Sequence, residues 1–180
     1  MILPADIYGA LTVYPEWAWA FNLGKNIENR TWPPPKKSFG KWIAIRAGKH
    51  MGGRIGFPAA LEGFGNVARV AELAGYSASV IPNLDTRNPR IVVAGPPGVH
   101  FTVSREMLRR SAITHICKLG TAGEVYGHEG PPEYPWAFPG QIGWLFTEVR
   151  KLSCPLACRG GLGVRPIDLA DKIEIIRRAS

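Results

Sequence analysis

Clusters of proline divide the chain into short segments, and this feature limits its possible folds more than any other. Three consecutive prolines occupy positions 33–35, four more lie within 77–100, and a second stretch rich in proline and glycine runs from 127 to 140. Proline lacks a backbone N–H and has a fixed φ, so none of these stretches can continue a helix or the ladder of a central strand. We therefore expect loops at all three places, with one short strand at 90–94.

Between these loops the residue patterns are those of short strands with interspersed helices. The clearest strand, 142–152, is apolar on both faces at its start, which suits a central position in a sheet. The pattern predicts an α+β fold with a small, mostly antiparallel and barrel-like sheet. The other expected strands are 10–14, 26–32, 41–47, 112–119, 121–126 and 153–159, and the expected helices are 15–24, 57–75, 103–111 and 167–178.

Two of these helices carry apolar residues at helical spacing, which predicts the faces that pack on the core. Trp19 lies off the stripe of the first helix, so we expect it to point away from the core. The predicted core faces are Trp17, Ala20 and Phe21 in the first helix, and Leu169, Ile173 and Ile176 in the last.

Length and charge narrow the class of protein. A chain of 180 residues suits a single domain, 1–180. No apolar run approaches the ~20 residues that cross a bilayer, and the N-terminus lacks the pattern of a signal peptide. We therefore expect a cytoplasmic protein with no membrane partner. Its 22 Lys and Arg against 14 Asp and Glu give a formal net charge of +8, which favours an anionic partner such as nucleic acid or a nucleotide.

The cysteines and histidines do not predict a metal centre. The three cysteines are odd in number, which does not favour a disulfide framework. Cys154 and Cys158 have a spacing that zinc pairs use, but a zinc site needs two further ligands, and the four histidines form no H-x₃₋₅-H pair. We therefore expect neither a metal nor a cofactor.

A charged motif, Lys25, Glu28 and Arg30, follows the first predicted helix. Because side chains alternate along a strand, Glu28, Arg30 and Trp32 should share one face. The two neighbouring cations favour the ionised form of Glu28. Such a cluster can accept hydrogen bonds from a base edge while its cations hold phosphate. A structural Glu28–Arg30 ion pair that closes the barrel is the alternative interpretation.

Aromatic side chains lie close to this motif in the sequence. Trp19 and Trp32 are candidates to stack on a base, which is worth about 1–3 kcal/mol per base. We assign Trp17 and Trp144 to the core, and Trp136, in the second proline-rich loop, could form a lid over the cleft.

Five cations lie within fourteen residues directly after the motif, and this density favours contact with phosphate groups. A second basic group, Arg105, Arg109 and Arg110, lies on the predicted helix 103–111. The residues of the first group are Lys36, Lys37, Lys41, Arg46 and Lys49.

Residues 11–32 and 39–49 together resemble the ASCH domain, a branch of the PUA-like superfamily. The family pattern is a strand, a P-W-A helix start, G-x-K-x-x-E-x-R-x-W and a G-x-x-x-I-H-A-x-K strand, and 142–167 resembles its closing strand and Gly-rich return. Three positions depart from this pattern: Lys25 directly follows Gly24, P-E-W replaces Q-P-W, and Arg46 stands where a His is common. The matching residues are Trp17, Ala18, Gly24, Lys25, Glu28, Arg30, Trp32, Gly40, Ile45, Ala47 and Lys49.

The resemblance implies a PUA-like small mixed β-barrel with flanking helices, and a cleft beside the first helix for RNA or a modified base. A Gly/Pro-rich insertion, about 51–110, has no counterpart in the family and could carry a site for a protein partner. The resemblance also implies an alternative function, a small hydrolase of modified nucleosides (N4-acylcytidine amidohydrolase-like) or a ribonuclease. Lys25 and Glu28 would then be the catalytic residues, although the amidohydrolase branch has a Thr where Glu28 stands.

Overall fold

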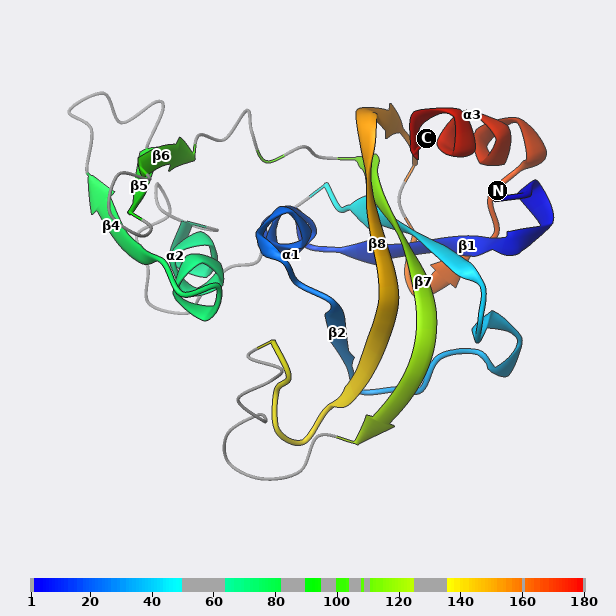
Figure 1. The fold of residues 1–180 in the computed structure, drawn as a ribbon, viewed down its shortest axis with the longest axis horizontal. Coiled ribbons are helices and arrows are strands. Elements are labelled where there is room, and N and C mark those ends of the chain that lie inside the picture. The colour runs from blue at the N-terminus through cyan, green and yellow to red at the C-terminus, as the bar shows by residue number, and fades with distance from the viewer. Residues whose placement is uncertain are drawn as a thin grey trace.

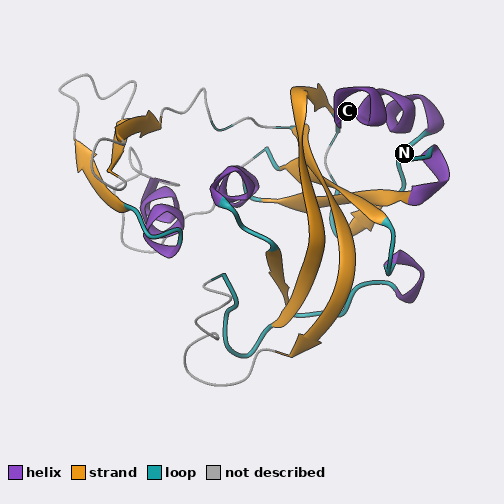
Figure 2. Cartoon of the chain, viewed as in Figure 1, coloured by secondary structure: helices purple, strands orange, loops and turns teal. Residues whose placement is uncertain are grey.

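The computed structural model describes residues 2–49, 64–81, 90–94, 100–103, 108, 111–124, 136–159 and 161–179. Strands predominate over helices in this part of the chain (Figure 2). The elements are η1 (Pro4–Asp6), β1 (Ile7–Val13), α1 (Pro15–Ala20), η2 (Phe21–Leu23), β2 (Ile27–Arg30), η3 (Lys36–Ser38), β3 (Trp42–Ala47), α2 (Phe64–Leu73), β4 (Ser77–Ile81), β5 (Arg90–Ala94), β6 (His100–Val103), β7 (Ala112–Glu124), β8 (Ile142–Ala157), β9 (Val164–Arg165) and α3 (Leu169–Ala179).

The main sheet has six strands in the order β2-β8-β7-β3-β1-β9 and curls into a half-barrel (Figure 1). Its strands pair antiparallel except for β1 and β3, which run parallel. The α+β class and the small, mostly antiparallel, barrel-like sheet that the sequence predicts are therefore confirmed.

The two longest strands, β7 and β8, give the sheet its curvature (Figure 1). Their pairing shifts register at three places, and such bulges bend strands and increase their twist. The prediction of separate strands at 112–119 and 121–126 is wrong, because the chain passes through Gly120 without interruption. A Cβ atom at Gly120 would lie 2.5 Å from Thr147 Cγ2, so glycine lets the two strands approach closely. Similarly, β8 continues into the predicted strand 153–159, and Pro155 lies beside a bulge that tolerates it.

The first predicted helix is confirmed, with Pro15 in its first turn and Gly24 at φ +88° after its end. The exclusion of Trp19 from its core face is wrong, because Trp19 is buried. Trp17 is half-buried and packs at the edge of both core clusters, so its assignment to the core is confirmed in part. The reason is that α1 packs on two sides: Ala18 and Phe21 join the core of the main sheet, and Trp19 joins a second cluster with residues of α2. Apolar residues at i, i+3 and i+4 define one buried face, so this pattern does not predict a helix that is buried on two sides.

Residues 77–100, expected to be a loop with one strand, contain strands that the sequence did not predict. β5 coincides with the predicted 90–94, but β4 and β6 flank it in a three-stranded antiparallel sheet. The strands are too short for periodicity to distinguish them from loops. The predicted helix 57–75 corresponds to α2 from Phe64 onward. Its beginning, the segments 82–89 and 95–99, and nearly all of the predicted helix 103–111 lie outside the described residues.

The C-terminal helix forms as predicted but packs through a different face. Ile175 and Ala179 are buried against the far side of the main sheet, while Leu169 is 64% exposed and Ile173 is 52% exposed. Ile176 packs at the edge of the same cluster. The assignment of Leu169 and Ile173 to the core is therefore wrong. Within the described part of the chain, no helix combines the length and the apolar content needed to cross a bilayer.

We expect Gly9→Ala to destabilise the protein by about 1–3 kcal/mol, since overpacking forces the backbone to shift. A Cβ atom at Gly9 would lie 2.5 Å from the carbonyl oxygen of Arg165, a backbone atom of β9 that cannot rotate away. Gly123→Ala is the matched control, because a Cβ there meets nothing within 4 Å. Urea denaturation gives the free energy of unfolding of both variants. Equal losses in Gly9→Ala and Gly123→Ala would contradict the close approach of β1 and β9.

Candidate functional site

A cleft of about 550 Å³ opens where the half-barrel does not close. It lies among the end of β1, the start of α1, β2 and the loop before β9. Its volume is in the range of small-molecule sites, about 300–1,000 Å³. The lining residues are Thr12, Val13, Tyr14, Trp17, Lys25, Glu28, Asn29, Arg30, Gly48, Lys49, Phe138, Gln141, Leu162 and Gly163.

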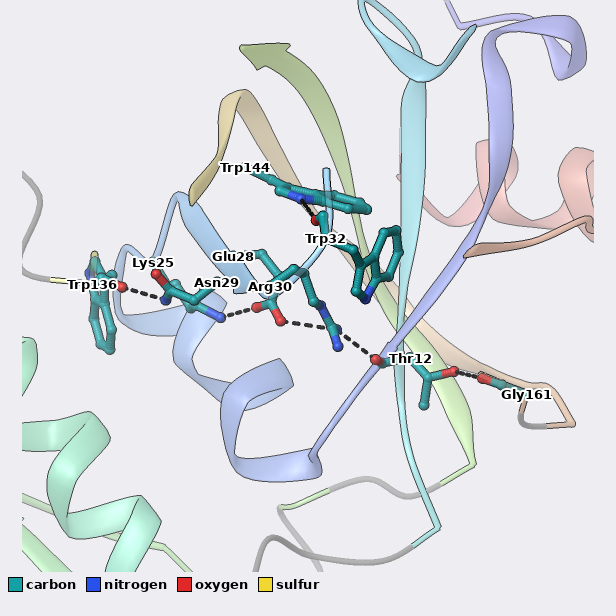
Figure 3. A network of polar contacts seen from close by, with 9 residues as sticks. All are labelled: Thr12, Lys25, Glu28, Asn29, Arg30, Trp32, Trp136, Trp144 and Gly161. Carbon is teal, nitrogen blue, oxygen red and sulfur yellow. Dashed lines mark hydrogen bonds and ion pairs between the residues drawn. The ribbon is translucent and has the colours of Figure 1, made fainter. Parts of the chain in front are cut away.

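Three charged side chains form one network in this cleft (Figure 3). Lys25 Nζ pairs with Glu28 Oε2, and Arg30 Nη2 lies 3.0 Å from Glu28 Oε1. Lys25 is only 2% exposed and Glu28 is also buried. The left-handed turn at Gly24 reverses the chain after η2, so that the Lys25 N–H donates to the Ala20 carbonyl and the lysine side chain lies beside β2. The Glu28–Arg30 ion pair that the sequence allowed is therefore present.

Arg30 also links the two sides of the cleft. Its Nη2 donates a hydrogen bond of 2.7 Å to the carbonyl oxygen of Thr12 on β1, and the Thr12 hydroxyl donates to the Gly161 carbonyl oxygen at 2.7 Å (Figure 3). β2 is an edge strand of the sheet and β1 lies next to the opposite edge, so this contact spans the open side of the half-barrel. The Nε atom of Arg30 is buried and has no hydrogen-bond partner in the described structure. The guanidinium therefore retains an unused donor at the cleft.

Aromatic rings surround the buried lysine. Lys25 Nζ lies 5.3 Å from the ring centroid of Trp17 and 4.9 Å from that of Phe21. Trp17 in turn meets Phe138 edge to face, with centroids 5.6 Å apart. Trp17 and Phe138 both line the cleft, and Tyr14 at its mouth is largely exposed. A flat ligand would thus find aromatic surface next to a network of charges.

Asn29 holds one wall of the cleft in place. Its side-chain amide donates to the Trp136 carbonyl oxygen at 2.6 Å, and its Oδ1 accepts from the Phe138 N–H at 2.9 Å. These two bonds attach the segment before β8 to β2 and position Phe138. No motif in the sequence marks Asn29 as a site residue. The available signal is its position between Glu28 and Arg30, on the strand that carries both charges.

Three tryptophans occupy positions other than those predicted. Trp19, expected to stack on a base, is buried in the cluster with α2. Trp136, expected as a lid, is buried in that same cluster. Trp32 does not line the cleft, since its ring packs edge to face on Trp144, with centroids 4.7 Å apart, and its carbonyl accepts a hydrogen bond from Trp144 Nε1. Trp144 is in the core as predicted.

The fold separates the five cations that are predicted to contact phosphate groups. Lys49 is exposed and lines the cleft, whereas Lys41 precedes β3 at its other end and lies 3.8 Å from Asp6. The length of β3 alone separates these ends by roughly 17 Å. Lys36 and Lys37 on η3 are exposed and do not line the cleft. The structure therefore does not bring the five cations together at the cleft, because cations close in sequence lie at opposite ends of one strand, and their contact with phosphate stays a prediction.

Arg46 faces the interior, where it supports the cleft from behind. It donates to the carbonyl oxygens of Arg159 at 2.6 Å and Gly161 at 3.0 Å, and it also bonds to the Thr12 hydroxyl. The side chain is buried and does not line the cleft, so nothing in the structure supports the predicted contact of Arg46 with phosphate. Arg46 instead holds the loop that carries Leu162 and Gly163 into the cleft.

Cys117 lies behind the charged network and is fully buried. Burial raises the pKa of its thiol well above the usual range, while Lys25 and Glu28 act in smaller and opposite directions. The thiol is therefore protonated at neutral pH and is not a nucleophile. Among the described residues, no cluster of His, Cys, Asp and Glu has the arrangement of a metal site.

No family model matches the sequence, and comparison with curated proteins gives no match.

Proposed function

We propose that the chain is a PUA-like, ASCH-type domain that binds RNA, or a nucleotide with a modified base, in the cleft beside α1. The observation that carries this proposal is the Lys25–Glu28–Arg30 network within a cleft that has aromatic side chains. All three residues belong to the motif on which the resemblance rests.

The charges and surfaces of the cleft suit one nucleotide. Lys25, Arg30 and Lys49 against Glu28 give 3 − 1 = +2 formal charges at the lining. Glu28 already accepts contacts from both cations, but each carboxylate oxygen has a second lone pair that can accept from an exocyclic amine. Phe138 and Trp17 supply apolar surface for a base, and Lys49 at the rim suits a phosphate.

The test is a titration of a labelled single-stranded RNA of ten nucleotides at low and high salt. Lys49→Glu should weaken binding about tenfold, equivalent to about 1.4 kcal/mol, because it places a negative charge at the cleft. Lys36→Glu makes the same change of charge on another exposed lysine that does not line the cleft, so its affinity should stay within about twofold.

Two outcomes would count against this proposal. Equal losses of RNA affinity in Lys49→Glu and Lys36→Glu would mean that binding depends on the net charge of the protein and not on the cleft. Absence of binding at low salt would exclude the cleft as a nucleic-acid site, since electrostatic attraction is strongest there.

A hydrolase is the second candidate, and the direct contact between Lys25 and Glu28 favours it. A lysine adjacent to a carboxylate can pass a proton to it, as general acid–base catalysis requires. Release of cytidine from N4-acetylcytidine in the same preparation, lost in Lys25→Met, would distinguish catalysis from binding alone.

A further inference from the structure

A second cleft, of about 530 Å³, lies on the opposite side of α1 and shares no lining residue with the first. At 100° per residue, Pro15, Ala18 and Trp19 occupy one side of the helix, and Trp17 points the other way toward the first cleft. The facing wall comes from neighbouring segments of β7 and β8. The residues that line this second cleft are Pro15, Ala18, Trp19, Asn22, Leu23, Thr114, His115, Lys151, Leu152, Ser153 and Pro155.

His115 on β7 is the buried polar group of this cleft. Only 2% of the residue is exposed, and its Nδ1 lies 3.0 Å from the Thr114 hydroxyl. Its Nε2 atom has no hydrogen-bond partner in the described structure. Buried polar atoms of native proteins are nearly always paired, so an unpaired imidazole nitrogen at a cleft wall indicates a missing partner. When the Thr114 hydroxyl donates to Nδ1, Nε2 carries the proton and is a donor.

Lys151 supplies one positive charge beside that donor. It lies directly opposite His115 in the β7–β8 pairing, so both side chains are on the same face of the sheet. Lys151 is exposed and forms no ion pair with the described residues. Phe21 from η2, whose ring centroid lies 5.7 Å from that of the imidazole, and Ile45, which is opposite His115 on β3, carry no charge.

We propose that this second cleft binds a small organic carboxylate, held by Lys151 and His115 Nε2, with its apolar body against Trp19 and Leu23. A monoanion matches the single cation, whereas a phosphate dianion would leave one negative charge uncompensated in a largely apolar cleft. The two oxygens of a carboxylate can accept from the ammonium and the imidazole at once. Pro15 and Pro155 complete the apolar walls.

Occupancy of the cleft and protonation of His115 are coupled. Burial, followed by the charge of Lys151, lowers the pKa of His115 to about 4, so the imidazole is neutral at pH 7. A bound carboxylate favours the imidazolium, because it is an opposite charge within contact distance. The bound ligand should therefore raise the pKa of His115 by about 1–3.

The experiment is a titration of the full chain with benzoate at pH 6, followed through the imidazole ¹⁵N resonances. His115→Gln identifies the His115 signals. We expect a saturable shift of His115 Nε2 and a higher pKa for His115 in the bound form. Lys151→Ala should weaken benzoate binding about tenfold. Lys36→Ala, another exposed lysine, is the control and should bind as the unaltered chain does.

Three results of the titration would contradict the proposed carboxylate site. No saturable change in the His115 signals would overturn the site, as would equal weakening in Lys36→Ala. Saturation by inorganic phosphate but not by benzoate would overturn the assignment to a carboxylate. The proposal is independent of RNA binding, since Lys151→Ala leaves the first cleft intact.

Discussion

Replacing Glu28 with alanine should lower the free energy of unfolding by about 3–5 kcal/mol, which is the cost of leaving a buried charge without its partner. Lys25 is 2% exposed, and Glu28 is the carboxylate that compensates it. The variant also leaves Arg30 without its ion pair at the open side of the half-barrel. The cation–π contacts of Lys25 with Trp17 and Phe21 remain, but they offset only part of the desolvation.

The chain contains a matched control for this experiment. Glu148 also bridges two cations, Lys118 at 3.3 Å and Arg150 at 3.2 Å, but its side chain is 42% exposed. Glu148→Ala should hardly change the urea midpoint, because exposed ion pairs contribute little. A double variant, Lys25→Met with Glu28→Leu, removes both buried charges and should recover much of the stability lost in Glu28→Ala. A loss in Glu28→Ala no larger than that in Glu148→Ala would show that the network is solvated.

Arg46→Met should lower the free energy of unfolding by about 2–4 kcal/mol and weaken ligand binding in the first cleft. Methionine fills a similar volume but donates no hydrogen bonds, so the carbonyl oxygens of Arg159 and Gly161 lose their buried donor. A buried carbonyl left without a donor costs about 1–3 kcal/mol, whereas the Gly161 carbonyl oxygen keeps the Thr12 hydroxyl as a donor. Among the described side chains, the Thr12 hydroxyl then remains as the donor from β1 to this loop, through its bond to the Gly161 carbonyl oxygen.

Hydrogen exchange gives this prediction a readout separate from global stability. Amides in 159–163 should exchange faster in Arg46→Met, because the loop opens locally. The amides of the β7–β8 pairing should exchange only as fast as the lower free energy of global unfolding requires. Arg165→Met is the control, since exposed Arg165 bonds only to the Leu162 carbonyl within that loop. If both variants release the loop equally, Arg46 is not the residue that holds it.

Local signals predicted most of the elements around the first cleft. Pro15 and Gly24 set the ends of the first helical segment, and alternation placed Glu28 and Arg30 on one face of a short strand. Apolar runs bounded by turn residues marked β3 and β8. These predictions succeeded because each depends on contacts between residues near one another in the chain.

Predictions of which surface a side chain occupies were less successful. Trp19 is buried against the expectation, because a second packing partner, α2, covers its side of α1, while Trp17 packs at the edge of both clusters and lines the first cleft. Leu169 and Ile173 were assigned to a buried face that the structure turns outward. The amphipathic pattern of a helix shows that one face is apolar, but the packed face also depends on the strands against which the helix lies.

The sequence by itself determined the class of fold and the charged motif, because both depend on residue type and short-range spacing. Only the tertiary structure decided which of the basic residues act together. Lys41 and Lys49 lie at opposite ends of β3, and Arg46 on that strand points inward. Of the five cations, Lys49 therefore lines the first cleft and Arg46 is buried behind it, whereas the other three lie away from the cleft. The physical reason is that the curl of the sheet brings Thr12, Arg30 and Gly161 together across the open side of the half-barrel, a contact between residues far apart in the chain that no local pattern encodes.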